Sequence, residues 1–288
     1  MSHRNPKSWF VLCIVLFVLF LGCTQVQKVS LKDAVPECQG QTQKDKVICR
    51  GLGWLFANPA DIQKDGFLEL GEEINLFYKF YLRGDNKQEK AFFKSIIESK
   101  VDYLLREHDL IVDFAGEITG YLAFAKIMKR LDIKRPMYDK FIKDEILTNP
   151  MTYPPNATYM ILNSALVEDI GYQPKMPFGN LVSQGVIARF SKNPELVPIG
   201  KAYASADDIQ NFYYDITHEI FAVSNFGDRD PGQYLLDDEI QFLKGIIPQG
   251  VTLYVEKGEL DILAELIVCS KMLNHTDYHS YEAGVQYI

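Results

Sequence analysis

Residues 214–227 read Tyr214-Asp-Ile-Thr-His-Glu-Ile-Phe-Ala-Val-Ser-Asn-Phe-Gly227. The apolar residues recur at intervals of three and four, the spacing that lines one face of an α-helix. Asn and Gly at the end of the stretch favour helix termination. Asp215 and Glu219 stand four positions apart and therefore share a face of the helix. The stretch predicts an apolar helix that carries a polar pair.

Similar pairs recur along the chain, each in a predicted helix. They are Glu69/Glu73, Asp113/Glu117, Tyr159/Asn163, Asp215/Glu219 and Asp261/Glu265. Their first members are separated by 44, 46, 56 and 46 residues, and a period near 46 is the length of one helical hairpin with its loops. A buried acid is costly unless it is paired or hydrated, so we interpret the pairs as parts of one shared polar centre.

The rest of the chain from residue 46 onward also shows helical spacing, with Pro and Gly between the helices. The predicted helices are 46–57, 67–83, 87–107, 112–131, 137–147, 156–169, 178–190, 205–224, 234–247, 251–257, 259–273 and 278–288. The sequence therefore predicts an all-α domain of repeated helical hairpins over residues 46–288.

The stretch 214–227, followed by Glu259-Leu-Asp-Ile-Leu-Ala-Glu-Leu-Ile267, resembles uncharacterised bacterial families, domains of unknown function with an α/α-toroid architecture. The resemblance covers roughly residues 205–288. The residues that carry it are Thr217, His218, Phe221, Asn225, Phe226, Gly227, Asp261, Glu265 and Leu266.

The resemblance implies inner helices that surround a central cavity and outer helices that alternate with them. By this count the inner helices are 67–83, 112–131, 156–169, 205–224 and 259–273. Six inner helices close the usual ring. We therefore expect either an incomplete ring or a chain that is truncated at its C-terminus.

The N-terminus has the order of a secretory signal. Arg4 and Lys7 precede an apolar run over residues 9–21, which is shorter than the roughly twenty residues that cross a bilayer. The run ends at Gly22-Cys23, which resembles the lipobox of bacterial lipoproteins, with Phe20 where Leu is usual. We predict a lipoprotein signal peptide over residues 1–22, with ordinary cleavage nearby as the alternative.

Cys23 would then be lipidated and become the first mature residue, anchoring the chain to a membrane of the cell envelope on its periplasmic or extracellular side. Residues 23–45 read as a polar tether. The formal net charge of −8 becomes about −10 once Arg4 and Lys7 are removed, and an acidic body is a poor partner for nucleic acid.

Three cysteines remain after Cys13 and Cys23 are set aside. Cys38 and Cys49 lie close in the sequence of a chain that we expect to be exported, which makes them candidates for a disulfide. Cys269 stands in an apolar helical stretch and is expected to be a buried, inert thiol.

His218 is the most specific candidate for chemistry, since Asp215 lies one turn before it and Glu219 beside it. A carboxylate neighbour orients an imidazole for general acid-base work. The alternative is a core histidine bonded to Asp215 or to a backbone carbonyl.

Asp113, Glu117, Asp261 and Glu265 could join His218 around the cavity. Two carboxylates in different surroundings can act as acid and base on a glycosidic bond, and several glycan-cleaving enzymes use α/α toroids. The alternative is a hydrated structural network. We predict no metal site, because Ala222 stands where a zincin helix has its second histidine, and the sequence identifies no cofactor.

The sequence thus predicts an exported lipoprotein whose polar centre binds a small molecule or a glycan. If the protein is an enzyme, we expect a glycan hydrolase or lyase. The rival prediction is a non-catalytic envelope scaffold that presents a surface to a partner protein. The sequence leaves open whether the protein is an enzyme.

Overall fold

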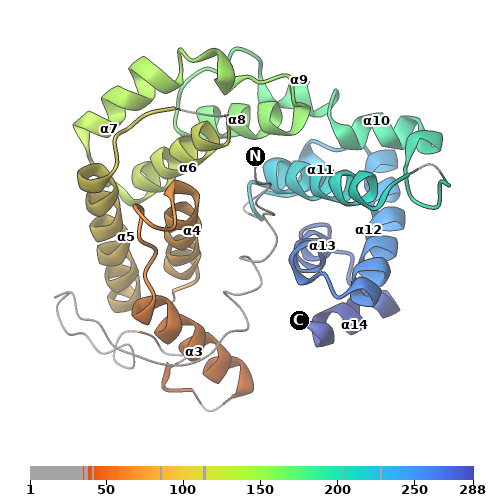
Figure 1. Ribbon diagram of the computed structural model, residues 1–288, viewed down its shortest axis with the longest axis horizontal. Helices are drawn as coiled ribbons and strands as arrows, with labels where there is room; N and C mark the ends of the chain where they lie inside the picture. The colour runs from red at the N-terminus through yellow and green to blue at the C-terminus, as the bar shows by residue number, and fades with distance from the viewer. Residues whose placement is uncertain are drawn as a thin grey trace. The chain divides into compact units, whose positions relative to one another are not determined.

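A computed structural model describes residues 35, 38–40, 42–84, 86–112, 115–202, 204–227 and 229–288. Regular structure within these ranges is helical and includes no strand, which confirms the predicted all-α fold (Figure 1). The predicted signal peptide, Cys23 and Asp113 lie outside the described residues. No helix in the described ranges has the length and apolar character that crossing a membrane requires.

The chain divides into two compact units, each described below by itself. The first consists of Met1–Asp113 and Ala123–Glu145, and the second of Phe114–Leu122 and Ile146–Ile288. Helix α6 (Ala115–Leu131) contributes to both units. The ring expected from the resemblance stays a prediction.

The first unit is built on the hairpin of α4 (Phe67–Arg83) and α5 (Lys87–Glu107), with α3 (Gln43–Ala57) and α7 (Pro136–Phe141) beside it. The hairpin buries Phe77 and Phe93 completely. Helix α3 begins at Gln43, three residues before the predicted start, because Thr42 and Asp45 form a capping box. A disulfide joins Cys49 of this helix to Cys38, which lies before the helix.

The second unit holds the remaining long helices. They are α8 (Ala157–Asp169), α9 (Phe178–Val182), α10 (Val186–Lys192), α11 (Ala206–Ser224), α12 (Asp237–Lys257), α13 (Leu260–Met272) and α14 (His279–Tyr287). Short 3-10 helices stand between them or before them: Pro150–Thr152, Pro194–Leu196 and Pro231–Gln233. The π-helical turn Ile142–Ile146 follows α7. Helix α12 runs beside α13 and α14 (Figure 1).

Hydrogen bonds join alternate helices of the second unit, as a repeat of hairpins requires. Thr119 of α6 donates to Asn163 of α8 across 2.7 Å. Thr158 of α8 donates to Asp215 of α11 across 3.4 Å. Each bond joins residues about one hairpin apart, at separations of 44 and 57 positions. Successive inner helices of the predicted repeat therefore touch one another.

Helix α12 continues through Pro248, where the sequence predicted two helices, 234–247 and 251–257. Proline lacks the N–H that a helix uses and crowds the preceding turn. The side-chain amide of Gln249 donates to the carbonyl oxygen of Gly245 across 2.9 Å. The acceptor that Pro248 leaves without its usual N–H donor is the carbonyl oxygen of Lys244, and the helix nonetheless continues to Lys257.

The predicted helix 178–190 is interrupted, and α9 and α10 replace it. The interruption falls at Gly185, the N-cap of α10. The first free amides of α10 find their acceptor in Glu219 of α11. A partner far away in sequence thus sets this boundary, which local spacing does not reveal.

Candidate functional site

Helix α11 carries most of the candidate residues, and its two ends fix its position. Ser205 and Asp208 form a capping box at its start, as the sequence predicted. At its end Asn225, Phe226 and Gly227 all have positive φ values, of 51°, 56° and 91°. The amide of Phe226 donates to the carbonyl oxygen of Phe221 across 2.8 Å. These bonds terminate the helix just after the turn that holds the histidine.

His218 projects from α11 with 42% of its side chain exposed. Its Nδ1 lies 2.8 Å from the carbonyl oxygen of Tyr214, one turn earlier. A carbonyl oxygen can only accept, so Nδ1 must carry the proton of this bond. In the neutral ring, Nε2 is then the nitrogen with the free lone pair. Among the described residues, none forms a hydrogen bond or an ion pair with Nε2.

Glu265 of α13 is the carboxylate within ion-pair distance of this ring. Its Oε2 lies 3.7 Å from Nδ1 of His218 and accepts a hydrogen bond of 2.5 Å from the hydroxyl of Thr217. Burial raises the pKa of Glu265, and His218 and the Thr217 hydroxyl oppose that rise. The buried carboxyl thus has a hydroxyl donor and an imidazole beside it.

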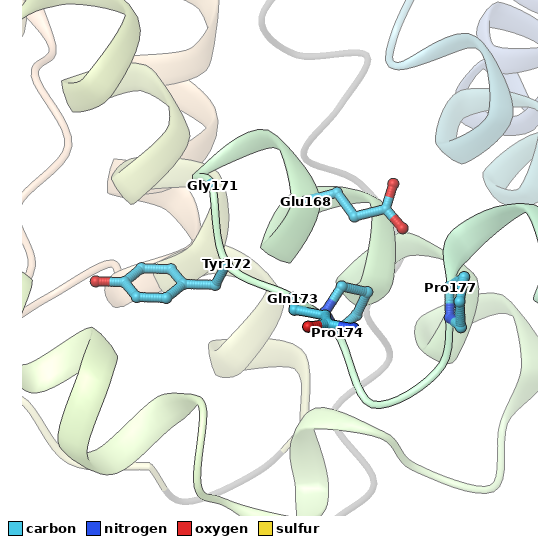
Figure 2. A pocket seen from close by; sticks show the side chains of 6 residues that line it. All are labelled: Glu168, Gly171, Tyr172, Gln173, Pro174 and Pro177. Atoms are coloured by element: carbon cyan, nitrogen blue, oxygen red, sulfur yellow. The ribbon is translucent and has the colours of Figure 1, made fainter.

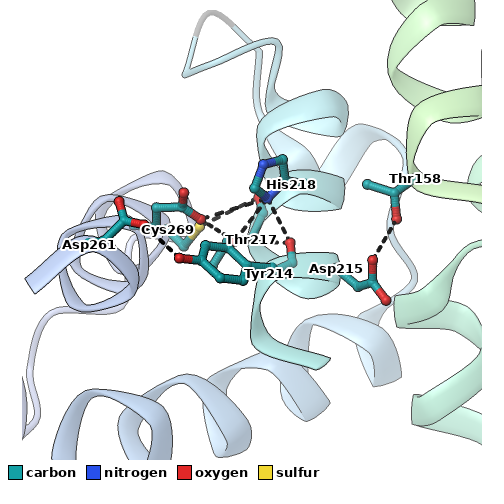
Figure 3. Close-up of polar contacts among 8 residues, drawn as sticks. Thr158, Tyr214, Asp215, Thr217, His218, Asp261 and Cys269 are labelled. Atoms are coloured by element: carbon teal, nitrogen blue, oxygen red, sulfur yellow. Dashed lines mark hydrogen bonds and ion pairs between the residues drawn. The ribbon is translucent and has the colours of Figure 1, made fainter. Parts of the chain in front are cut away.

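Tyr214 and Asp261 form a second contact between the same two helices. The Tyr214 hydroxyl donates to Oδ2 of Asp261 across 2.6 Å (Figure 3). Burial, followed by this hydrogen bond, raises the pKa of Tyr214, which keeps the hydroxyl protonated. Tyr214 therefore orients His218 through its backbone and Asp261 through its side chain.

Asp215 points away from the histidine. Figure 3 shows its carboxylate directed toward Thr158 of α8, on the side of α11 opposite Asp261. Burial raises the pKa of Asp215, while the Thr158 hydroxyl and His218 lower it. The carboxylate within ion-pair distance of His218 is that of Glu265, whereas Asp215 bonds to Thr158.

Glu219 is fully buried and closes the interface between α11 and α10. Its Oε2 accepts the amides of Val186 and Ile187, at 2.6 and 3.1 Å, while Oε1 has no hydrogen-bond partner. Burial raises the pKa of Glu219 to about 8, against the opposing effect of the two amides. Glu219 serves as a helix cap in the packed interior and does not belong to the exposed site.

Two of the other recurring pairs also have a second member that is buried and bonded inside the fold. Their second members Glu73 and Asn163 are buried, like Glu219 and Glu265. Glu73 accepts from Lys100 and from the amide of Ala60, and Asn163 bonds to Thr119 and Thr152. Glu117 is half-buried near the start of α6. The recurrence of these pairs therefore reflects, in large part, polar side chains that bond one helix to another.

Sequence reasoning missed Tyr214 and Thr217, which hold the two acids of α13. A signal was present, because they lie 47 and 48 positions before their partners, close to the period of the repeat. Cys269 is buried, as predicted, and burial raises the pKa of its thiol. The described ranges hold no cluster of three His, Cys, Asp or Glu residues that could bind a metal.

Two open hollows lie elsewhere on the second unit. One, of about 430 Å³, is lined by Glu168, Gly171, Tyr172, Gln173, Pro174 and Pro177 (Figure 2). The other, of about 380 Å³, lies against Phe242, Gly245 and Gln249 of α12. In the first, Glu168 is engaged, since its Oε1 accepts the amide of Phe178 across 2.9 Å. Neither hollow includes the polar residues shared by α11 and α13.

Residues 204–288 match the family model of a domain of unknown function (DUF6895). No curated protein and no solved structure matches the chain. The matched segment contains α11 to α14, and with them Tyr214, Thr217, His218, Asp261 and Glu265. The part of the chain that carries the histidine site is thus similar to an uncharacterised domain.

Proposed function

We propose that the protein binds a glycan on the face that α11 and α13 share, and that His218 is its proton acceptor. We call this surface the α11–α13 face and define it by Tyr214, Thr217, His218, Asp261 and Glu265. The observation that carries the proposal is the fixed imidazole, whose Nδ1 is engaged by Tyr214 while 42% of the side chain is exposed. A half-exposed ring with a free Nε2 suits general base chemistry.

Hydrolysis is the reaction that fits these groups. Attack of water on a glycosidic carbon releases a proton from the water, and the departing sugar oxygen takes one up. Nε2 of His218 can accept the first proton. Water can supply the second, while the Glu265 carboxylate stays beside the protonated ring, 3.7 Å from Nδ1.

A binding assay with a matched control tests the proposal. The variants are His218→Ala and His275→Ala; His275 pairs with Asp277 at 3.2 Å, outside the α11–α13 face. Saturation-transfer NMR against a panel of neutral, amino and acidic oligosaccharides should show binding by the parent protein. We expect His218→Ala to lose about tenfold or more in affinity and His275→Ala to lose none. The proposal fails if no glycan binds, or if both variants bind like the parent.

A non-catalytic envelope scaffold is the second candidate, and one specific observation favours it. Asp215, Asp261 and Glu265 each have an internal hydroxyl partner, as a purely structural network would. If the protein is such a scaffold, neither the parent nor the His218→Ala variant binds a glycan, and the ligand is a partner protein. The same assay therefore separates the two candidates.

The proposed location is the cell envelope, with a lipid on Cys23 as the anchor. The lipobox-like end of the signal supports it, because a cysteine follows a small residue there. Labelling with a radioactive fatty acid should mark the full chain and not the Cys23→Ser variant. Label on both proteins, or on neither, would contradict the anchor.

A further inference from the structure

We propose that the α11–α13 face selects glycans that carry hydroxyl or amino groups and rejects those that carry carboxylate, sulfate or phosphate groups. The inference rests on the proposed function and names its substrate class. It arises from the hydrogen-bonding capacity and the charge that the face leaves for a ligand.

Every hydrogen-bond donor of the face is used internally. The Tyr214 hydroxyl donates to Asp261, the Thr217 hydroxyl to Glu265, and Nδ1–H of His218 to the backbone of Tyr214. What remains for a ligand is a set of acceptors: Nε2 of His218 and the carboxylate oxygens of Asp261 and Glu265. An acceptor surface binds groups that donate, such as hydroxyl and ammonium groups.

The charges around the face have one sign apart from His218. The charged groups that act on Tyr214 are Asp261 and Glu265, and those that act on Glu265 are His218 and Asp261. The charged group that acts on Asp215 is His218. No Lys or Arg of the described residues is among the groups that shift the pKa of Tyr214, Asp215 or Glu265. An acidic sugar would therefore meet carboxylates without a cation to neutralise its charge.

This arrangement of charges also favours hydrolysis over elimination. Elimination on a uronic acid removes the proton next to a carboxylate, so the enzyme must offset the negative charge that builds up there. The charged groups of the α11–α13 face other than His218 are carboxylates, which cannot offset that negative charge. Hydrolysis of a neutral or amino sugar carries no such requirement.

A row of rings beside the acceptors fits the same class of ligand. The rings of Tyr214 and His218 lie 5.9 Å apart, and those of His218 and Phe221 lie 6.0 Å apart. Phe226 continues the row, stacked on Phe221 at 5.7 Å. Aromatic faces are partially negative and attract ammonium groups and the C–H face of a sugar ring. The row therefore adds a contact surface that an amino sugar can use.

Three oligosaccharides of equal length test the inference by calorimetric titration of the parent protein: one of glucosamine, one of N-acetylglucosamine and one of galacturonic acid. We expect the first two to bind at least about tenfold more tightly than the third. Added salt should weaken only the glucosamine complex, because that complex alone gains from opposite charges.

Asp261→Asn keeps an oxygen for the Tyr214 hydroxyl and removes one charge, so the fold is retained. It should lower the affinity for the glucosamine oligomer by about three- to tenfold and leave the neutral oligomer unchanged. Asp277→Asn, whose parent carboxylate is 89% exposed and lies off the face, is the matched control and should change neither affinity.

The outcomes separate the two proposals. Tighter binding of the galacturonic acid oligomer, or equal binding of all three, overturns the inference and leaves glycan binding intact. Binding of none of the three overturns the inference and the proposed function together.

Discussion

The hydroxyl of Thr217 donates a hydrogen bond of 2.5 Å to the carboxylate of Glu265, between residues 48 positions apart. Both side chains are buried, and the bond joins α11 to α13. The same carboxylate lies 3.7 Å from Nδ1 of His218. One hydroxyl therefore determines where the acid beside the histidine lies.

Thr217→Val should reveal the energy of that bond. Valine has nearly the shape of threonine but lacks the donor, so Glu265 loses its hydroxyl partner in a buried setting. We expect the free energy of unfolding to fall by about 1.5–3 kcal/mol, the range for hydrogen bonds to charged groups. Urea denaturation measures the change. Thr217→Ser keeps the hydroxyl and should recover most of the loss; a Thr217→Val protein as stable as the parent would contradict the role of the bond.

Glu219 should make stability depend on pH. Its pKa rises from 4.5 in its ordinary environment to about 8 in the fold, so the folded state holds one more proton than the unfolded chain between these values. Stability is then fully present below pH 4.5 and falls as the pH rises toward 8, by an amount on the order of a few kcal/mol.

Glu219→Gln tests this dependence, because the amide keeps an oxygen for Val186 and Ile187 and carries no charge. The variant should lose the decline in stability between pH 5 and pH 8, measured by thermal unfolding. Glu256→Gln, at an exposed position of α12, should retain the decline of the parent. An unchanged pH dependence in Glu219→Gln would show that Glu219 is not its source.

Gly185→Ala should break the cap of α10. A Cβ at Gly185 would stand 2.1 Å from Oε1 of Glu219, so the carboxyl would have to move off the amides that it accepts. We expect a loss of roughly 1–3 kcal/mol in the free energy of unfolding. Gly179→Ala, in open space on α9, should stay within about 0.5 kcal/mol of the parent. Equal effects of the two substitutions in denaturant titrations would argue against the close approach.

Two glycines of α12 give opposite expectations for the same substitution. A Cβ at Gly250 would lie 2.5 Å from the ring of Tyr213, whereas one at Gly245 would meet no atom within 4 Å. Gly250→Ala should cost about 1–3 kcal/mol through overpacking. Gly245→Ala should stabilise the helix by about 0.5–1 kcal/mol, because alanine restricts the unfolded chain. The melting temperature of each variant, compared with that of the parent, measures the two effects. Stabilisation by both substitutions would disprove the close approach of Gly250 to the Tyr213 ring.

The helices could be predicted from sequence because each carries its own apolar period and end signals. Ser205 with Asp208 marked the start of α11, and the Asn225 to Gly227 turn marked its end. The errors fell where a distant side chain decides the local structure. Glu219, 33 positions away from Val186, divides the predicted helix 178–190.

The site was predictable in part for the same reason. Four-residue spacing placed Asp261 and Glu265 on one face of α13, and the sequence marked His218 as the candidate for chemistry. The sequence paired His218 with Asp215, the acid one helical turn before it, whereas the carboxylate within ion-pair distance in the structure is that of Glu265. Side-chain direction around α11, which turns Asp215 toward Thr158, is set by packing against α8.

The position of the proton on the His218 ring gives the most direct test of the proposed role of this residue. Nitrogen NMR of the imidazole should show the neutral ring with its proton on Nδ1, as the bond to the Tyr214 carbonyl oxygen requires. Addition of a glucosamine oligomer should then shift the Nε2 signal and leave that of Nδ1 nearly unchanged. A neutral ring with its proton on Nε2, or an Nε2 signal that does not move at saturating glycan, would contradict the account.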